Sequence, residues 1–528
     1  MNRSPLIAAI TGIVAGALLL TSCSSSPDPS DGDGGAQQLR IIATEPSAGL
    51  DPAVAVTQAS LRVMELMYDT LVDYDKDNNL VPMIAEDWKM SDDGLTYVFT
   101  LRDASFSDGS AITADDVVYS VERAAAGEAM GGRLTALTSV EVTGDKEVTM
   151  TLSEPSRVFL NALAATGSAA ILKKEAVEAN ADYFAKPTAT SGPWQLKENV
   201  QQSHATLSAN ENYWNTDLSL FDEITYTYST DTTAMAAAVE TGTADMTYNM
   251  RPADAVRLGD AGTIQFFEAP SPGILSWGVD KSQPPFDDVD VRQAVAYIAP
   301  RADRLETCWS DIGPVSYGEV IYEGQDFYTE GEQRFDLDAN AALKKANALL
   351  DQAGWKAGAD GVREKDGVKL AVDVPYENTW TQARCNTEML QQALQPAGIA
   401  ITPVAYDRAN FWTDVAADKF KMYHAGNNYA TVDAYFQQTF ACEGSANNLI
   451  AKWCNEDVDA MIAQALASSD TDKVKDLYRQ VQDIILDEQP MITTGAQYAV
   501  IGASPKLEGY YPRADASNRA LMYATLSD

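Results

Sequence analysis

Residues 91–119 read SDDGLTYVFTLRDASFSDGSAITADDVVY, and this stretch contains the clearest local structural signals in the chain. Its first part alternates polar and apolar side chains from Leu95 to Leu101 between two polar turns, which is typical of a strand in an antiparallel hairpin. Thr113 then precedes two acidic residues and an apolar run, as an N-cap does at the start of a helix. The stretch therefore predicts a strand, a reversal of the chain and a helix.

The sequence on both sides of this stretch shows the same mixture of strand and helix signals. The predicted strands are 39–43 and 498–501, and the predicted helices are 55–68, 289–297 and 473–487. No internal repeat or low-complexity block interrupts the pattern. With 528 residues and 45% hydrophobic content, the chain is expected to form an α/β protein of two or three domains.

The N-terminal residues carry an export signal. Arg3 supplies a positive charge, and the uncharged run from Leu6 to Leu20 is shorter than the roughly 20 apolar residues that a membrane-spanning helix needs. Leu20-Thr21-Ser22-Cys23 resembles a bacterial lipobox, which implies acylation of Cys23; a plain signal peptide with an incidental cysteine is the alternative. We expect a lipoprotein signal peptide at 1–22 and a flexible tether at 23–38, and therefore an extracytoplasmic protein anchored to the cell membrane.

The charge balance excludes one class of partner. Acidic residues outnumber basic ones by 76 to 38, a formal net charge of −38 that is spread along the chain. Nucleic acid is not an expected partner, because phosphate binding requires a basic face. A uniformly solvated acidic surface explains the excess better than a cation-binding role.

Four cysteines remain after Cys23: Cys308, Cys385, Cys442 and Cys454. An even number in an oxidising compartment favours disulfides over a metal site, and no pair has the spacing of a zinc knuckle or a redox motif. Four cysteines allow three connectivities. The short polar loop between Cys442 and Cys454 favours that pair, which leaves Cys308 with Cys385 by elimination, as the weaker of the two predictions.

The catalytic motifs of a secreted hydrolase are missing from the sequence. It contains no Gly-x-Ser-x-Gly, no Ser-x-x-Lys, no glycine-rich phosphate loop with a lysine and no His-Glu-x-x-His. His204 and His424 are the only histidines, and neither lies in a recognisable catalytic setting. We therefore expect a protein that is not an enzyme, with no cofactor and no metal site of its own. A structural role for His424 is weighed against contact with a metal complex bound as solute.

Several motifs together resemble one family, the bacterial extracellular solute-binding proteins of family 5, whose members bind dipeptides, oligopeptides or nickel. The resemblance covers nearly all of 39–528. It is carried, in order, by residues 80–88, 91–102, 106–119, 191–194, 212–214, 240–245, 285–295 and 444–459. Cys442 and Trp453-Cys454 resemble the dipeptide-binding members, in which a disulfide closes this loop. The motif residues themselves are expected to build the scaffold and not to touch solute.

The resemblance implies an α/β fold of the periplasmic-binding-protein type (cluster C, type II), with two lobes and a cleft between them. The first lobe is expected at 39–275 and 492–528, with a subdomain inserted at roughly 77–190, and the second lobe at 281–488. Two crossing segments, 276–280 and 491–498, would form the hinge. Binding in such a receptor is domain closure around the solute.

The resemblance also locates two solute anchors. Dipeptide-binding relatives hold the solute's amine with an Asp in a Gly-Asp-Asn run and its carboxylate with an Arg before a Pro-Tyr pair. Here Asn427 and Val374 occupy these positions, so both anchors are uncharged. A free dipeptide gripped at both ends is therefore doubtful, since charge-assisted hydrogen bonds are the stronger ones. Asp433 is a possible substitute for the amine partner, with a solvated helix-capping role as the alternative.

Aromatic residues lie in or beside the segments expected to face the cleft. The candidates for solute contact are Trp277, Tyr376, Trp380, Trp412 and Tyr429, together with Arg384, His424, Asn427 and Asp433. Aromatic walls suit peptides, sugars and flat organic solutes alike, and core packing is the alternative for each ring. For Arg384, the alternative is a surface ion pair with Glu388.

These observations predict the solute receptor of an ABC importer, a monomer that delivers a peptide or similarly sized solute to permease and ATPase subunits. The absent anchors favour a peptide longer than two residues. A non-peptide solute, such as an oligosaccharide, a small organic molecule or a metal chelate, is the main alternative. An envelope interaction lipoprotein without transport and a secreted hydrolase are the more distant ones.

Overall fold

The computed structural model describes most of the chain after the predicted tether. The described residues are 37–46, 49–54, 57–127, 133–248, 250–269, 272–429, 431–468, 470–496, 498–513 and 517–527. The predicted signal peptide, Cys23 and nearly all of the tether lie outside this range. No helix among the described residues is long and apolar enough to span a membrane.

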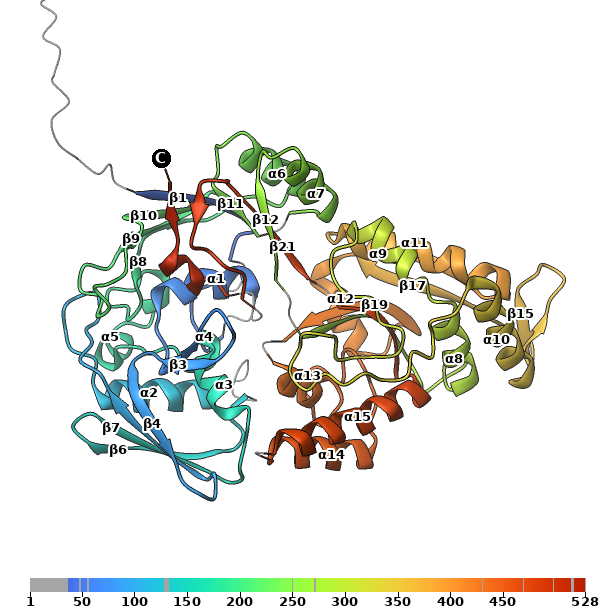
Figure 1. Cartoon of the computed structure of the whole chain (residues 1–528), viewed down its shortest axis with the longest axis horizontal. Coiled ribbons are helices and arrows are strands. Elements are labelled where there is room, and N and C mark those ends of the chain that lie inside the picture. Colours follow the sequence, from blue (N-terminus) through green and yellow to red (C-terminus); the bar gives the residue numbers. More distant parts are fainter. Residues whose placement is uncertain are drawn as a thin grey trace, which may run out of the picture. The chain divides into compact units, whose positions relative to one another are not determined.

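A seven-stranded sheet combines strands from both ends of the chain (Figure 1), in the order β12-β21-β11-β1-β10-β9-β8. The bounds are β1 Gln38–Ala43, β8 Trp194–Val200, β9 His204–Ala209, β10 Glu223–Tyr228, β11 Met246–Thr247, β12 Gln265–Ala269 and β21 Ala499–Ala503. β1 runs parallel to β10 and β11, whereas β21 runs antiparallel to β11 and β12. The strands predicted at 39–43 and 498–501 are thus confirmed, with small shifts at their ends.

Helices α1 Gln58–Met67, α6 Thr232–Glu240 and α7 Pro252–Asp260 belong to the same region. α1 confirms the helix predicted at 55–68, with Thr57 as its N-cap. Leu66 and Met67 of α1 pack with Leu39 and Ile41 of β1 in one buried apolar cluster. The smaller elements at the ends of this region are β2 Val72–Tyr74, β3 Leu80–Pro82, β22 Leu507–Glu508, β23 Thr525–Leu526 and a 3-10 turn at Arg519–Tyr523.

Residues 85–152 form a separate four-stranded antiparallel sheet in the order β4-β5-β7-β6. Its elements are β4 Ala85–Met90, β5 Thr96–Leu101, β6 Leu137–Gly144, β7 Glu147–Leu152 and helix α2 Ala114–Ala125, followed by α3 Phe159–Ala164, α4 Thr166–Ala169 and α5 Lys174–Ala179. In β5, Tyr97, Phe99 and Leu101 are buried on one face, as the alternation predicts. Thr113 caps α2, and Asp116 completes a capping box, so the predicted strand and helix are both confirmed.

The second large region is built on a three-stranded sheet, β19-β13-β20, and a parallel pair, β17 and β18. The strands are β13 Gly273–Val279, β17 Ala371–Glu377, β18 Ala400–Tyr406, β19 Met422–Asn428 and β20 Met491–Gly495, with a small meander of β14 Lys356–Ala357, β15 Arg363–Lys365 and β16 Val368–Lys369. The helices are α8 Val289–Ile298, α9 Ala302–Trp309, α10 Ala339–Gln352, α11 Thr381–Leu394, α12 Arg408–Ala416, α13 Val432–Thr439, α14 Glu456–Leu466 and α15 Thr471–Glu488. α8 and α15 confirm the helices predicted at 289–297 and 473–487.

The chain passes twice between the seven-stranded and the three-stranded sheet. The first passage joins the end of β12 at Ala269 to the start of β13 at Gly273, and the second joins Gly495 to Ala499. Most of the segment expected to cross at 276–280 is instead paired with β19 and β20, and most of 491–498 is strand β20. Strand pairing within the second region satisfies the backbone hydrogen-bonding groups of β13 and β20. The two passages therefore lie beyond the ends of these paired strands.

Candidate functional site

Three of the candidate aromatic residues meet at one place in the second region. Antiparallel pairing places Trp277 of β13 directly opposite His424 of β19, with their ring centroids 6.0 Å apart. Trp380, at the N-cap of α11, lies edge-on to the same imidazole at 4.8 Å. Trp277 and His424 are buried, and Trp380 is partly exposed. The structure thus brings together three residues that lie far apart in the sequence.

A short hydrogen-bond chain determines which nitrogen of His424 carries a hydrogen. The indole N–H of Trp309 donates to Oδ1 of Asn386 at 3.4 Å, so the amide nitrogen of Asn386 faces Nε2 of His424, 3.1 Å away. Nε2 must accept this bond, and in a neutral imidazole the hydrogen then resides on Nδ1. Burial, together with the positive charge of Arg304, lowers the pKa of His424 to about 3, so the ring is neutral.

Arg304 of α9 is a member of this cluster that the sequence analysis missed. Its side chain is fully buried, and Nη2 donates to the carbonyl oxygen of Thr494 at 3.3 Å. A signal existed, because residues 301, 304, 305, 308 and 309 form one stripe of a helix. Leu305 and Trp309 belong to that stripe, so the arginines at 301 and 304 lie on a buried face.

The two other candidates in and after β19 bind one another. Asn427 donates its side-chain N–H to the hydroxyl of Tyr429 at 3.1 Å, and that hydroxyl lies 2.5 Å from Oγ1 of Thr439. Burial raises the pKa of Tyr429 to about 12. Tyr429 packs with Tyr435 in a buried apolar cluster. In this structure its ring is therefore part of the core, which was the alternative to solute contact.

Asp433 is neither solvated nor a helix cap. Thr431 caps α13, and Asp433 in the first turn is buried, where Oδ1 accepts a 2.5 Å hydrogen bond from Tyr478. Nε of Arg157 lies 3.5 Å from Oδ2. Desolvation raises the pKa of Asp433 in spite of these partners. The solvated alternative for Asp433 is therefore wrong, because packing of α13 against α15 removes the carboxylate from water.

Tyr376, Trp412 and Arg384 make contacts of other kinds. Tyr376 is buried in β17, and Trp412 of α12 donates its indole N–H to Glu377 at 2.8 Å. Arg384 is 65% exposed and pairs with Glu388 one turn along α11 at 2.8 Å, which is the surface ion pair weighed against solute contact. Val374, at the position of the absent arginine anchor, is buried in an apolar core.

The structure pairs the four cysteines as the sequence favours. The sulfur atoms of Cys308 and Cys385 are 2.03 Å apart and join α9 to α11, beside Arg304 and Trp380. Those of Cys442 and Cys454 are 2.05 Å apart.

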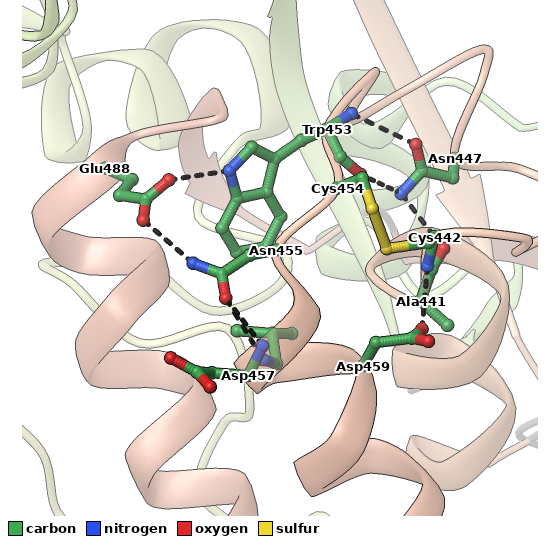
Figure 2. The surroundings of a disulfide bond; sticks show 10 residues. Ala441, Cys442, Asn447, Trp453, Cys454, Asn455, Asp457, Asp459 and Glu488 are labelled. Atoms are coloured by element: carbon green, nitrogen blue, oxygen red, sulfur yellow. Dashed lines mark hydrogen bonds between the residues drawn. A yellow bond between two sulfur atoms is a disulfide. The ribbon is translucent and has the colours of Figure 1, made fainter.

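A hydrogen-bond network surrounds the second disulfide (Figure 2). Glu488 accepts from the indole N–H of Trp453 at 2.7 Å and from the side chain of Asn455 at 2.9 Å. Asn447 binds both the backbone N–H and the carbonyl oxygen of Trp453, and Asp459 accepts from the backbone N–H of Cys442. These contacts tie the loop to the end of α15.

A surface hollow of about 460 Å³ is lined by Arg157, Phe327 and Lys475, among others, and shares no lining residue with the His424 cluster. No group of three or more metal-ligating side chains occurs within the described part of the chain.

Two α/β regions joined by two passages of the chain have the fold of the periplasmic binding proteins. The model of the "Bacterial extracellular solute-binding proteins, family 5 Middle" matches residues 79–447, and the chain belongs to this family.

Its relatives carry names that refer to several solutes. The "Glutathione-binding protein GsiB" of Salmonella paratyphi A is 27% identical over 475 residues, which cover 88% of this chain and 89% of the relative. The "Dipeptide-binding protein" of Escherichia coli is 26% identical over 477 residues, which cover 84% and 86%.

Solved structures share the fold at lower identity. The oligopeptide-binding protein AppA of Bacillus subtilis, in complex with a nonapeptide, has a TM-score of 0.79 at 23% identity and covers 93% of this chain and 100% of its own. NikZ of Campylobacter jejuni, in complex with Ni(L-His), has a TM-score of 0.81 at 20% identity, covering 92% and 99%.

Proposed function

We propose that this chain is the extracytoplasmic receptor of an ABC importer and captures a peptide longer than two residues between two lobes. The first lobe comprises 37–269 and 499–527, with the four-stranded sheet inserted in it, and the second comprises 273–495. The two passages form the hinge, and solute contacts to both lobes favour closure. The closed form is recognised by the permease, and no chemical step on the solute is involved.

The observation that carries the proposal is the pair of passages, Ala269 to Gly273 and Gly495 to Ala499, which connect two sheets built from different parts of the chain. Two short connections allow rotation of the lobes without unfolding of either core. Family membership supports the same function.

The solute class follows from the two uncharged anchor positions. Val374 is buried among apolar side chains, and Asn427 donates to Tyr429, so neither offers a charge to a free dipeptide. An unpaired terminal ammonium or carboxylate is costly to bury. A longer peptide gains affinity from its backbone and side chains, for which the partly exposed Trp380 supplies apolar surface. A non-peptide of similar size is the alternative, since relatives are named for solutes as different as glutathione and a nickel complex.

The same proposal includes a monomer with a lipid anchor at Cys23. The lipobox-like residues before Cys23 support the anchor. Metabolic labelling with a fatty-acid probe tests it: wild type is labelled, and Cys23→Ala is not.

Two measurements test the receptor function. Native mass spectrometry of protein purified from its own host is expected to show a co-purified small molecule. Calorimetric titration with peptides of two to nine residues is expected to give micromolar or tighter binding for the longer peptides only. Small-angle scattering is expected to show a smaller radius of gyration with solute bound. Micromolar binding of dipeptides contradicts the solute class, and an unchanged radius on binding contradicts closure.

A further inference from the structure

The buried cluster around His424 has more hydrogen-bond donors than acceptors. Among the described residues, Nε and Nη1 of Arg304, Nδ1 of His424 and Nε1 of Trp277 are buried and have no hydrogen-bond partner. All four atoms are donors, given that Nε2 of His424 accepts from Asn386. Buried donors without acceptors are rare in folded proteins and costly, so they require an explanation.

Arg304 differs from two other buried arginines of the chain, Arg513 and Arg519. Arg519 and Arg513 lie 3.3 Å and 2.8 Å from the carboxylates of Asp69 and Asp73. Arg304 has no ion pair among the described residues, and its single hydrogen bond goes to a backbone carbonyl. An unpaired buried charge of this kind is strongly destabilising unless an anion joins it.

Arg304 is fully buried next to one of the two passages between the lobes. Its guanidinium lies against Gly495, the last residue of β20 before the second passage. Ile312, just after α9, packs with Val500 and Met250 of the first region. α9 also contacts both α11 and α7. The unpartnered donors therefore lie where the two regions meet.

We propose that Arg304, with the N–H groups of His424 and Trp277, binds a carboxylate of the solute. This inference rests on the proposed receptor function and makes it more specific. The guanidinium has two unpartnered N–H donors, at Nε and Nη1, for the carboxylate oxygens, and the two ring N–H groups bind the remaining lone pairs. Arg304 thereby replaces the arginine anchor that is absent at Val374.

The first experiment uses alanine-based peptides of three, four and five residues, each with a free or an amidated C-terminus, and one amidated series containing a single Glu. A charge-assisted bond contributes about 1.5–3 kcal/mol, so wild type is expected to bind the carboxylate-bearing form about 10- to 150-fold more tightly than the neutral amide. The free-acid and Glu series distinguish a terminal from a side-chain carboxylate. Equal affinity for both carboxylate forms and the neutral amide in wild type overturns the inference.

The variants assign this preference to Arg304. Arg304→Met is expected to reduce it to less than about threefold with the amide affinity unchanged, and Arg304→Lys to retain part of it. Arg479→Met, at an exposed ion pair on α15, is the control and is expected to keep the full preference. A preference that persists in Arg304→Met overturns the inference.

A second experiment needs no solute. Without solute, Arg304→Met is expected to unfold at the same or a higher temperature than wild type, because it removes an unpaired charge. Arg301→Met is the matched control on the same helix. Arg301 is also buried, but it donates to the carbonyls of Ala296, Ala299 and Thr493, so its loss is expected to lower the Tm.

The two experiments separate the inference from the proposed function. If Arg304→Met lowers the Tm as much as Arg301→Met does, Arg304 has a structural role. The inference then fails, whichever peptides the wild-type protein binds. If no peptide binds to wild type, the peptide proposal fails, and the unfolding comparison alone decides the role of Arg304.

Discussion

Nε of Arg157 lies 3.5 Å from Oδ2 of Asp433, and this ion pair connects the region of the four-stranded sheet to helix α13 of the second region. The backbone N–H of Arg157 also donates to Leu466 at 3.0 Å, and its Nη1 to Ser468 at 2.7 Å. Arg157 therefore joins the two proposed lobes through three separate contacts.

The pair is expected to couple in a double-mutant cycle. Arg157→Met leaves the buried Asp433 carboxylate with Tyr478 as its partner, so it should destabilise the protein, and Asp433→Asn should relieve part of that loss. Because Arg157 is one-quarter exposed, we expect a modest coupling energy of about 1–2 kcal/mol in urea unfolding. The exposed pair of Arg384 and Glu388 serves as control and should couple by less than about 0.5 kcal/mol. Equal coupling for the two pairs contradicts the prediction.

The Cys442–Cys454 disulfide closes a loop with a sequence separation of 12 residues. Cys442→Ser with Cys454→Ser is expected to reduce the free energy of unfolding by about 2–4 kcal/mol, because the unfolded chain regains freedom. Chemical denaturation of the oxidised proteins measures the change. Glu488→Gln is a useful companion, since it weakens the hydrogen bonds to Trp453 and Asn455 while it retains the disulfide. If the double serine variant has the same free energy of unfolding as wild type, the prediction for this disulfide is wrong.

The Cys308–Cys385 disulfide has a separation of 77 residues and holds α9 against α11. Alkylation of the unreduced mature protein, followed by mass spectrometry, is expected to modify none of the four cysteines. Replacement of both Cys308 and Cys385 by serine should also weaken binding of carboxylate-bearing peptides. The reason is that this disulfide holds α9, which carries Arg304, against α11, whose N-cap is Trp380. Alkylation of Cys308 without reduction refutes this pairing.

His424 predicts a specific pH dependence of stability. Its pKa is about 3 in the folded protein and about 6.5 in the unfolded chain, so between these values the unfolded state binds the extra proton. Stability from this group is therefore lost as the pH falls from 6.5 towards 3, by up to about 1.4 kcal/mol per pH unit. His424→Gln, which cannot take up the proton, should show a shallower slope than wild type in urea unfolding between pH 6.5 and 4. Identical slopes for wild type and His424→Gln contradict the assignment.

Local patterns predicted the secondary structure well. The alternation in 95–101 and the cap at Thr113 depend on neighbours a few residues away, so β5 and α2 could be predicted directly. The first passage between the sheets lies several residues before the predicted segment 276–280, whereas the second, Gly495 to Ala499, overlaps the predicted segment 491–498. Strand β13 is buried throughout, and only its pairing with β19 and β20 shows where the strand ends and the connection begins.

The candidate site was predicted less completely. Trp277, Trp380 and His424 were selected as separate candidates, and the structure brings them together. Arg304 was not selected, because an arginine on a short helix is usually solvent-exposed. Its burial depends on the contact of α9 with α11 and on the end of β20, which come from distant parts of the chain.

The sequence by itself determined the acidic character, the four cysteines after Cys23 and the family, and it predicts the export signal, since each depends on composition or on short motifs in a fixed order. Only the tertiary structure decided which donors lack acceptors at His424 and Arg304, and which carboxylate faces Arg157. The physical reason is that a polar group's partners are chosen by packing between segments remote in the chain, and no local pattern records them.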